Sequence, residues 1–195
     1  MNVITETLQE ARSAIDALLA NEKGLAAIAA AGRILSGSLK DGGRIYSCGN
    51  GGSMCDAMHF AEELSGRYRL DRRPLPATAI SDPGHMTCVA NDFGYDAVFS
   101  RYIEAHGRAG DCLLAISTSG KSPNVLAAAR AAAAQHISVI ALTGRVGCPL
   151  SPLATVEICT PAGRFADRVQ EVHIQVLHIL VELIERELFP ENYRD

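Results

Sequence analysis

The segment RIYSCGNGGS, residues 44–53, constrains the fold of this chain more than any other stretch. Its apolar first half predicts a short buried strand, glycines follow, and Ser53 opens a helical pattern over residues 53–66. Glycines let the backbone approach a ligand closely, and the free amides at a helix start favour anions, phosphates above all. The spacing fits neither the dinucleotide nor the Walker A pattern. The segment therefore predicts a phosphate-binding turn, with a tight turn that binds nothing as the alternative.

Strands and helices alternate along the rest of the chain, which is typical of a parallel sheet with helices on both faces. The continuous apolar run at residues 112–116 predicts a strand that is covered on both sides. We therefore expect an α/β fold with a doubly wound, five-stranded, mainly parallel sheet. The expected strands are 44–48, 77–80, 112–116, 137–142 and 156–159, and the expected helices are 53–66, a short one within 81–91, 95–106, 124–135 and 165–189.

Two amphipathic helices, at about 3–20 and 24–40, precede the first strand. A minimal alternating sheet has no place for them, so we expect them to cover a sheet edge or to pack against another subunit. The length of 195 residues predicts a single domain, residues 1–195, with the N-terminal helices (1–41) packed on it.

Composition excludes several classes of protein. The net charge of −4 argues against a broad nucleic-acid surface, and no apolar run reaches membrane-spanning length. The acidic residues near the N-terminus do not fit a signal peptide. The six cysteines form no Cys-x-x-Cys pair, so we interpret them as reduced core residues of a cytoplasmic protein.

A second turn, at residues 117–123, repeats the first in a form rich in hydroxyl groups. It follows an expected strand, and Pro123 falls at the first turn of an expected helix. A serine–threonine turn with a helix cap explains one hydroxyl but not four. Lys121 is the one charge within this loop. We therefore predict that the turn binds a phosphate through Ser117, Thr118, Ser119 and Ser122.

His59 and Glu63 lie four residues apart in the expected helix 53–66 and so share one of its faces. An imidazole beside a carboxylate suits a metal ion or an acid–base pair, with a plain surface contact as the alternative. The basic loop 67–76 is interpreted as a solvated connection, in which Arg67 is best placed to reach a site.

The last expected helix carries several polar side chains that suit a site. Gln170 and His178 are eight residues apart, about 80° around the helix and about 12 Å along it. Glu171 aligns better with His178, so spacing alone does not select Gln170. We interpret His173 as a surface residue of this helix.

Several motifs together resemble the bacterial phosphoheptose isomerases of the sugar-isomerase (SIS) superfamily, over nearly the whole chain. The serine–threonine turn is shared widely in that superfamily, whereas its combination with the His/Glu and Gln/His pairs is more specific. Ala90 stands where members often have Gly, and the segment 161–166 differs among them. The motifs are SCGNGGS followed by CDAMHFAEEL, NDFG, GDCLLAISTSGKS, VIALTG and DRVQEVHIQVLHIL.

The resemblance implies an aldose–ketose isomerase that converts sedoheptulose 7-phosphate to glycero-manno-heptose 7-phosphate, toward lipopolysaccharide or related glycans. It also implies one zinc ion per subunit and a homotetramer with active sites at subunit interfaces. Glu63 and His178 would be the catalytic acid–base groups. The implied metal ligands are His59, Glu63, Gln170 and His178. The implied substrate contacts are Asn50, Gly51, Gly52, Ser53, Glu63, Arg67, Asn91, Asp92, Ser117, Thr118, Ser119, Ser122, Asp167 and Gln170.

Two alternatives remain open. Some relatives of these isomerases are non-catalytic regulators that bind a replication initiator protein, but they have lost isomerase residues that this chain keeps. Other SIS enzymes act on different sugar phosphates and lack this combination of His, Glu and Gln.

Overall fold

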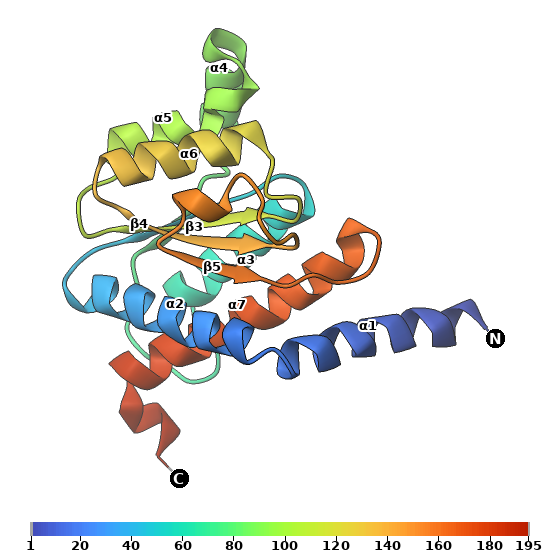
Figure 1. Cartoon of the computed structure of the whole chain (residues 1–195). Helices are drawn as coiled ribbons and strands as arrows, with labels where there is room; N and C mark the ends of the chain where they lie inside the picture. The colour runs from blue at the N-terminus through green and yellow to red at the C-terminus, as the bar shows by residue number, and fades with distance from the viewer. Residues whose placement is uncertain (1, 195) are drawn as a thin grey trace.

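A central parallel sheet organises the molecule, seen in a computed structural model that describes residues 2–194 (Figure 1). Its five strands lie in the order β2-β1-β3-β4-β5, and every neighbouring pair is parallel. This confirms the predicted α/β fold. The strands are β1 (Ile45–Cys48), β2 (Ala77–Ala79), β3 (Cys112–Ser117), β4 (Ser138–Thr143) and β5 (Val156–Cys159).

Helices cover both faces of the sheet (Figure 1). One face packs against α2 (Glu22–Lys40), α3 (Gly52–Ser65) and α7 (Ala166–Leu188). The opposite face packs against α5 (Val98–His106) and α6 (Pro123–Ala134). All six residues of β3 are buried, as expected of a strand covered on both sides.

The helix α4 (Pro83–Phe93) is joined to α5 by a single 3-10 turn, Tyr95–Ala97. It projects beyond the α5 and α6 layer (Figure 1). Val89 is its one buried residue. Further 3-10 turns lie at Ser151–Leu153, before β5, and at Pro190–Tyr193, after α7.

The two N-terminal helices have different surroundings. The helix α2 packs against α7 and one face of the sheet, mainly at the edge strand β5, which agrees with the expected cover of a sheet edge. The helix α1 (Val3–Leu19) extends away from the body (Figure 1), and Ala14 is its one buried residue. Large apolar side chains on α1 stay exposed, including Val3, Leu8 and Leu19 at 65–70%.

The cysteines are only partly core residues. Cys48, Cys112 and Cys148 are buried, but Cys55 and Cys88 are exposed on α3 and α4, which corrects the prediction for these two. All six thiols are free. Within residues 2–194, no helix combines the length and the apolar character needed to cross a membrane.

Candidate functional site

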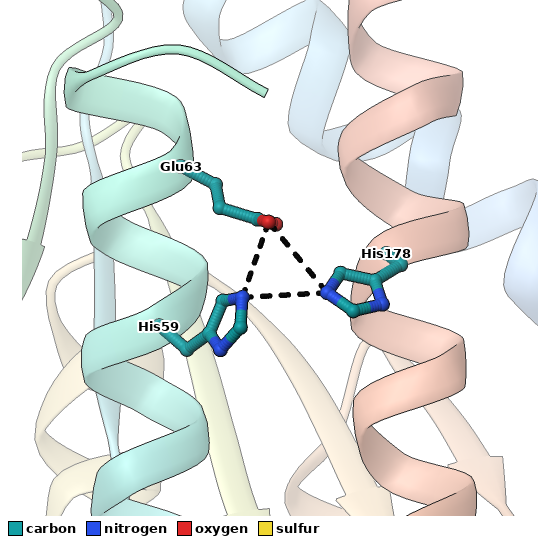
Figure 2. A group of neighbouring side chains, drawn as sticks. All are labelled: His59, Glu63 and His178. Atoms are coloured by element: carbon teal, nitrogen blue, oxygen red, sulfur yellow. Dashed lines mark hydrogen bonds and ion pairs between the residues drawn. The ribbon is translucent and has the colours of Figure 1, made fainter. Parts of the chain in front are cut away.

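Two helices bring two imidazoles and a carboxylate together (Figure 2). His59 and Glu63 lie on one face of α3, as predicted, and His178 reaches them from α7. His59 Nε2 is 3.1 Å from Glu63 Oε1 and 3.3 Å from His178 Nε2. His178 Nε2 lies 3.6 Å from the same Glu63 oxygen. All three come from one chain, and their ligand atoms lie within 4.8 Å of one another.

The two carboxylate oxygens of Glu63 have different surroundings. Oε1 faces both imidazoles, whereas Oε2 is buried and has no hydrogen-bond partner among the described residues. The Glu63 side chain is 13% exposed, against 42% for His59 and 34% for His178. A buried oxygen without a donor is costly unless a ligand or a cation meets it. Two imidazole nitrogens and a carboxylate oxygen therefore fit a divalent metal such as zinc.

An aromatic ring supports the imidazole on α7. Tyr68 stacks on His178, with ring centroids 5.9 Å apart and an interplanar angle of 27°. Arg69 in turn lies over the Tyr68 ring at 5.0 Å. Sequence reasoning missed Tyr68, because only the fold shows that the loop after α3 passes beside α7.

Gln170 lies at the opposite end of α3 from Glu63. Its carboxamide nitrogen is 2.6 Å from the place where a Cβ on Gly52 would stand, so a larger residue at position 52 would require the Gln170 side chain to move. On the same helix, Glu171 pairs with Arg168 at 2.5 Å. The Glu171 carboxylate is therefore paired with Arg168 and does not belong to the imidazole–carboxylate cluster. The role of Gln170 as a fourth metal ligand stays a prediction.

A second carboxylate belongs to the same helix. Asp56 lies three residues before His59, and its Oδ2 is buried without a hydrogen-bond partner among the described residues. Burial raises the pKa of Asp56 to about 6, against the opposing effect of His59. Asp56 was not among the predicted site residues, although its spacing to His59 places both near one face of the helix.

The two predicted phosphate turns lie at the carboxyl ends of the adjacent strands β1 and β3. Each has a glycine at positive φ, Gly51 at 58° and Gly120 at 63°. Such ends of parallel strands are where open α/β folds bind ligands.

The hydroxyls of the second turn divide into two groups. Ser117 Oγ accepts from the Gly120 amide and lies 3.1 Å from Ser122 Oγ, so it helps to shape the loop. Thr118 and Ser119 instead line a cavity of about 320 Å³, together with Arg145 and Arg164. These arginines lie outside the loop and add positive charge beside it to that of Lys121.

A reciprocal amide pair holds the two turns together. Asn50 Nδ2 donates to Asn124 Oδ1 at 2.8 Å, and Asn124 Nδ2 donates to Asn50 Oδ1 at 2.9 Å. The Tyr95 hydroxyl also donates to Asn50 Oδ1, at 3.2 Å. Asn50 thus helps to shape the two turns, and its role as a substrate contact stays a prediction. Asn124 and Tyr95 were missed, because their partner lies far away in the sequence.

Four of the predicted substrate contacts have side chains that are exposed in the single chain. Arg67 makes an exposed pair with Asp71 at 3.1 Å. Asn91 and Asp92, at the end of α4, are exposed and bond to each other at 2.7 Å. Asp167 is 61% exposed at the start of α7. Ser53, by contrast, is 4% exposed.

The interpretation of His173 as a surface residue is wrong. Its side chain is fully buried, and neither ring nitrogen has a hydrogen-bond partner among the described residues. Burial lowers the pKa of His173 to about 4, although the nearby Thr143 backbone weakly favours the proton. The loop 67–76 is also not solvated throughout, because the Arg72 side chain is 1% exposed.

Comparison with known proteins agrees with this arrangement. The SIS domain family matches residues 8–144. A phosphoheptose isomerase from Aeromonas hydrophila is 57% identical over 95% of this chain and 97% of its own length. The structure of a phosphoheptose isomerase from Neisseria gonorrhoeae has a TM-score of 0.79 at 38% identity, and covers 93% of this chain and 94% of that chain. One from Francisella tularensis has a TM-score of 0.85 at 33% identity, with 95% and 100% covered. This chain therefore belongs to the SIS domain family and, within it, to the phosphoheptose isomerases.

Proposed function

We propose that this chain converts sedoheptulose 7-phosphate to D-glycero-D-manno-heptose 7-phosphate through an enediol. The observation that carries the proposal is the convergence of His59, Glu63 and His178 within 4.8 Å. The glycine turns at the ends of β1 and β3 supply the phosphate site. The relatives that this chain matches over nearly their full length are named for the same reaction.

Isomerisation of a ketose to an aldose moves protons at two carbons and two oxygens. Glu63 takes the proton from carbon 1 of the ketose and returns it to carbon 2. His178 moves a proton from oxygen 1 to oxygen 2. We assign the transfer at carbon to the Glu63 carboxylate, whose Oε1 faces both imidazoles.

The ligand set proposed for zinc, one ion per subunit, is His59, Glu63, Gln170 and His178. The first two and His178 converge in one chain, whereas Gln170 lies beside Gly52 at the other end of α3 and would have to move to join them. When bound, the ion would act as a Lewis acid that stabilises negative charge on the sugar oxygens. The same donor types also accept other divalent metals, so zinc is the first choice rather than the sole candidate.

The phosphoryl end of the sugar is assigned to the second turn. Thr118 and Ser119 face a cavity there, and Arg145 and Arg164 line its wall. Hydroxyls and backbone amides fix the position of a phosphate, and guanidinium groups balance its charge. Asn50, held by Asn124, joins this turn to the one at the start of α3.

The proposed assembly is a homotetramer with active sites at subunit interfaces. The exposed apolar side chains on α1 support it, because a helix whose apolar face is uncovered in one chain gains stability by packing against a second copy. Arg67, Asn91 and Asp167 are exposed in one chain. A neighbouring subunit would then complete the part of the substrate site that these residues form. The free thiols suit the proposed location in the cytoplasm.

The proposal is tested with the purified chain and a panel of ketose phosphates. We expect aldose formation from sedoheptulose 7-phosphate, its loss after treatment with a metal chelator, and its return when zinc is added back. A non-catalytic regulator would form no aldose under any of these conditions. Another SIS enzyme would prefer a different sugar phosphate in the same panel.

A further inference from the structure

A buried ion pair joins the two helices that carry the imidazole–carboxylate cluster. Arg72 follows α3, and its Nε donates to Glu185 Oε1 on α7 at 2.9 Å. The side chains of Arg72 and Glu185 are 1% and 0% exposed. The second oxygen of Glu185 accepts from the Tyr193 hydroxyl at 2.7 Å, so both carboxylate oxygens are engaged. Such a pair is expensive to bury and needs this full set of partners.

The other nitrogens of Arg72 bind the end of α3. Nη2 donates to the backbone carbonyl of Glu63 at 2.6 Å. Nη1 donates to the carbonyls of Leu64 at 2.9 Å and Gly66 at 2.7 Å. The last carbonyls of a helix have no partner within the helix, and Arg72 supplies one for two of them. One guanidinium thus fixes the backbone of Glu63 directly.

The Arg72–Glu185 pair joins the two helices that carry the imidazole–carboxylate cluster of His59, Glu63 and His178. Glu185 lies seven residues after His178, about 10 Å along the same helix. The Arg72–Glu185 bond therefore connects the backbone of Glu63 on α3 to the helix that presents His178. The planar fork of Arg can reach a carboxylate and several carbonyls at once, whereas the ammonium group of Lys donates from a single point.

We propose that Arg72 is a positioning residue, which acts with Glu185 to hold Glu63 and His178 at the separation that the metal site requires. This inference rests on the proposed function, because it assigns the pair a task within that site. A purely structural pair would stabilise the fold without affecting metal affinity or turnover in a folded variant.

Three variants separate these roles. Arg72→Lys keeps a positive charge beside Glu185 but not the fork. The double variant Arg72→Met with Glu185→Leu removes both charges, so that no unpaired charge stays buried. Arg130→Lys is the matched control, because it makes the same substitution at an exposed position of α6, on the opposite face of the sheet.

The measurements are zinc affinity by calorimetry, kcat and KM at saturating zinc, and hydrogen exchange of the amides in residues 62–68. For Arg72→Lys, we expect zinc binding to weaken at least tenfold, kcat to fall at least threefold and KM to stay within twofold, because the phosphate turns are untouched. Exchange of these amides should accelerate. Arg72→Met with Glu185→Leu should show larger effects, and Arg130→Lys should stay within twofold of wild type.

Zinc affinity, kcat and amide exchange within twofold of wild type in folded Arg72→Lys would overturn the proposal. If the double variant fails to fold, the Lys variant decides alone. If wild-type protein binds no zinc and forms no aldose, the proposed function fails by itself. In that case amide exchange without metal still decides whether Arg72 fixes the end of α3.

Discussion

Replacing Glu63 with Gln lowers kcat for aldose formation by about 10²–10⁴-fold, while the sugar phosphate still binds. Gln has nearly the same shape and keeps one oxygen, but it cannot accept a proton from carbon. The measurement is a steady-state assay at saturating zinc, with sugar-phosphate binding followed separately by calorimetry.

Glu62→Gln serves as the control, because Glu62 is the exposed neighbour of Glu63 on α3 and loses the same charge. Its kcat should match that of wild type. Turnover of Glu63→Gln within about tenfold of wild type would limit the contribution of Glu63 to about 1.4 kcal/mol. The base would then have to be sought elsewhere, with Asp56 on the same helix as the first candidate.

Lowering the pH from 7 to 4 should destabilise the folded protein by about 3 kcal/mol through His173 alone. Burial lowers the pKa of His173 to about 4 in the folded state, from 6.5. Between these values the unfolded chain binds a proton that the folded chain excludes. Stability contributed by the neutral ring is therefore present above pH 6.5 and lost as the pH falls toward 4. Urea unfolding across this range measures the loss.

His173→Leu isolates this contribution from that of the carboxylates. Leu fills the same buried position without a titrating group or an unsatisfied nitrogen. The variant should be at least as stable as wild type at pH 7, and the stability gap should widen by about 3 kcal/mol at pH 4. Parallel stability curves for the two proteins would show that His173 does not exclude the proton.

Local patterns predicted the parts of the site that depend on a single element. Residues four apart in a helix, such as His59 and Glu63, share one face. Glycines that follow an apolar strand favour a tight turn before the next helix. The buried face of α7 was also predictable from the sequence. His173 lies four residues after Val169 and four before Leu177, both buried, so the same periodicity would have placed it inside. Its polar side chain led to the wrong interpretation.

Long-range partners were beyond the reach of local patterns. Arg72 and Glu185 are 113 residues apart, and Asn50 and Asn124 are 74 apart. The choice between Gln170 and Glu171 as the partner of His178 depends on how α7 is rotated against α3, and packing of the whole core sets that rotation. The uncovered face of α1 has the apolar spacing of an ordinary core helix, so its exposure in one chain was not predictable from spacing.

The most direct test of the isomerase account is proton NMR of sedoheptulose 7-phosphate incubated in D2O with the wild-type, zinc-loaded protein. We expect a new anomeric signal of the aldose and deuterium at carbon 2 of the product. The proton that Glu63 removes from carbon 1 is replaced by a solvent deuteron before carbon 2 is protonated. An unchanged ketose spectrum, with no aldose and no deuterium in the sugar, would contradict it.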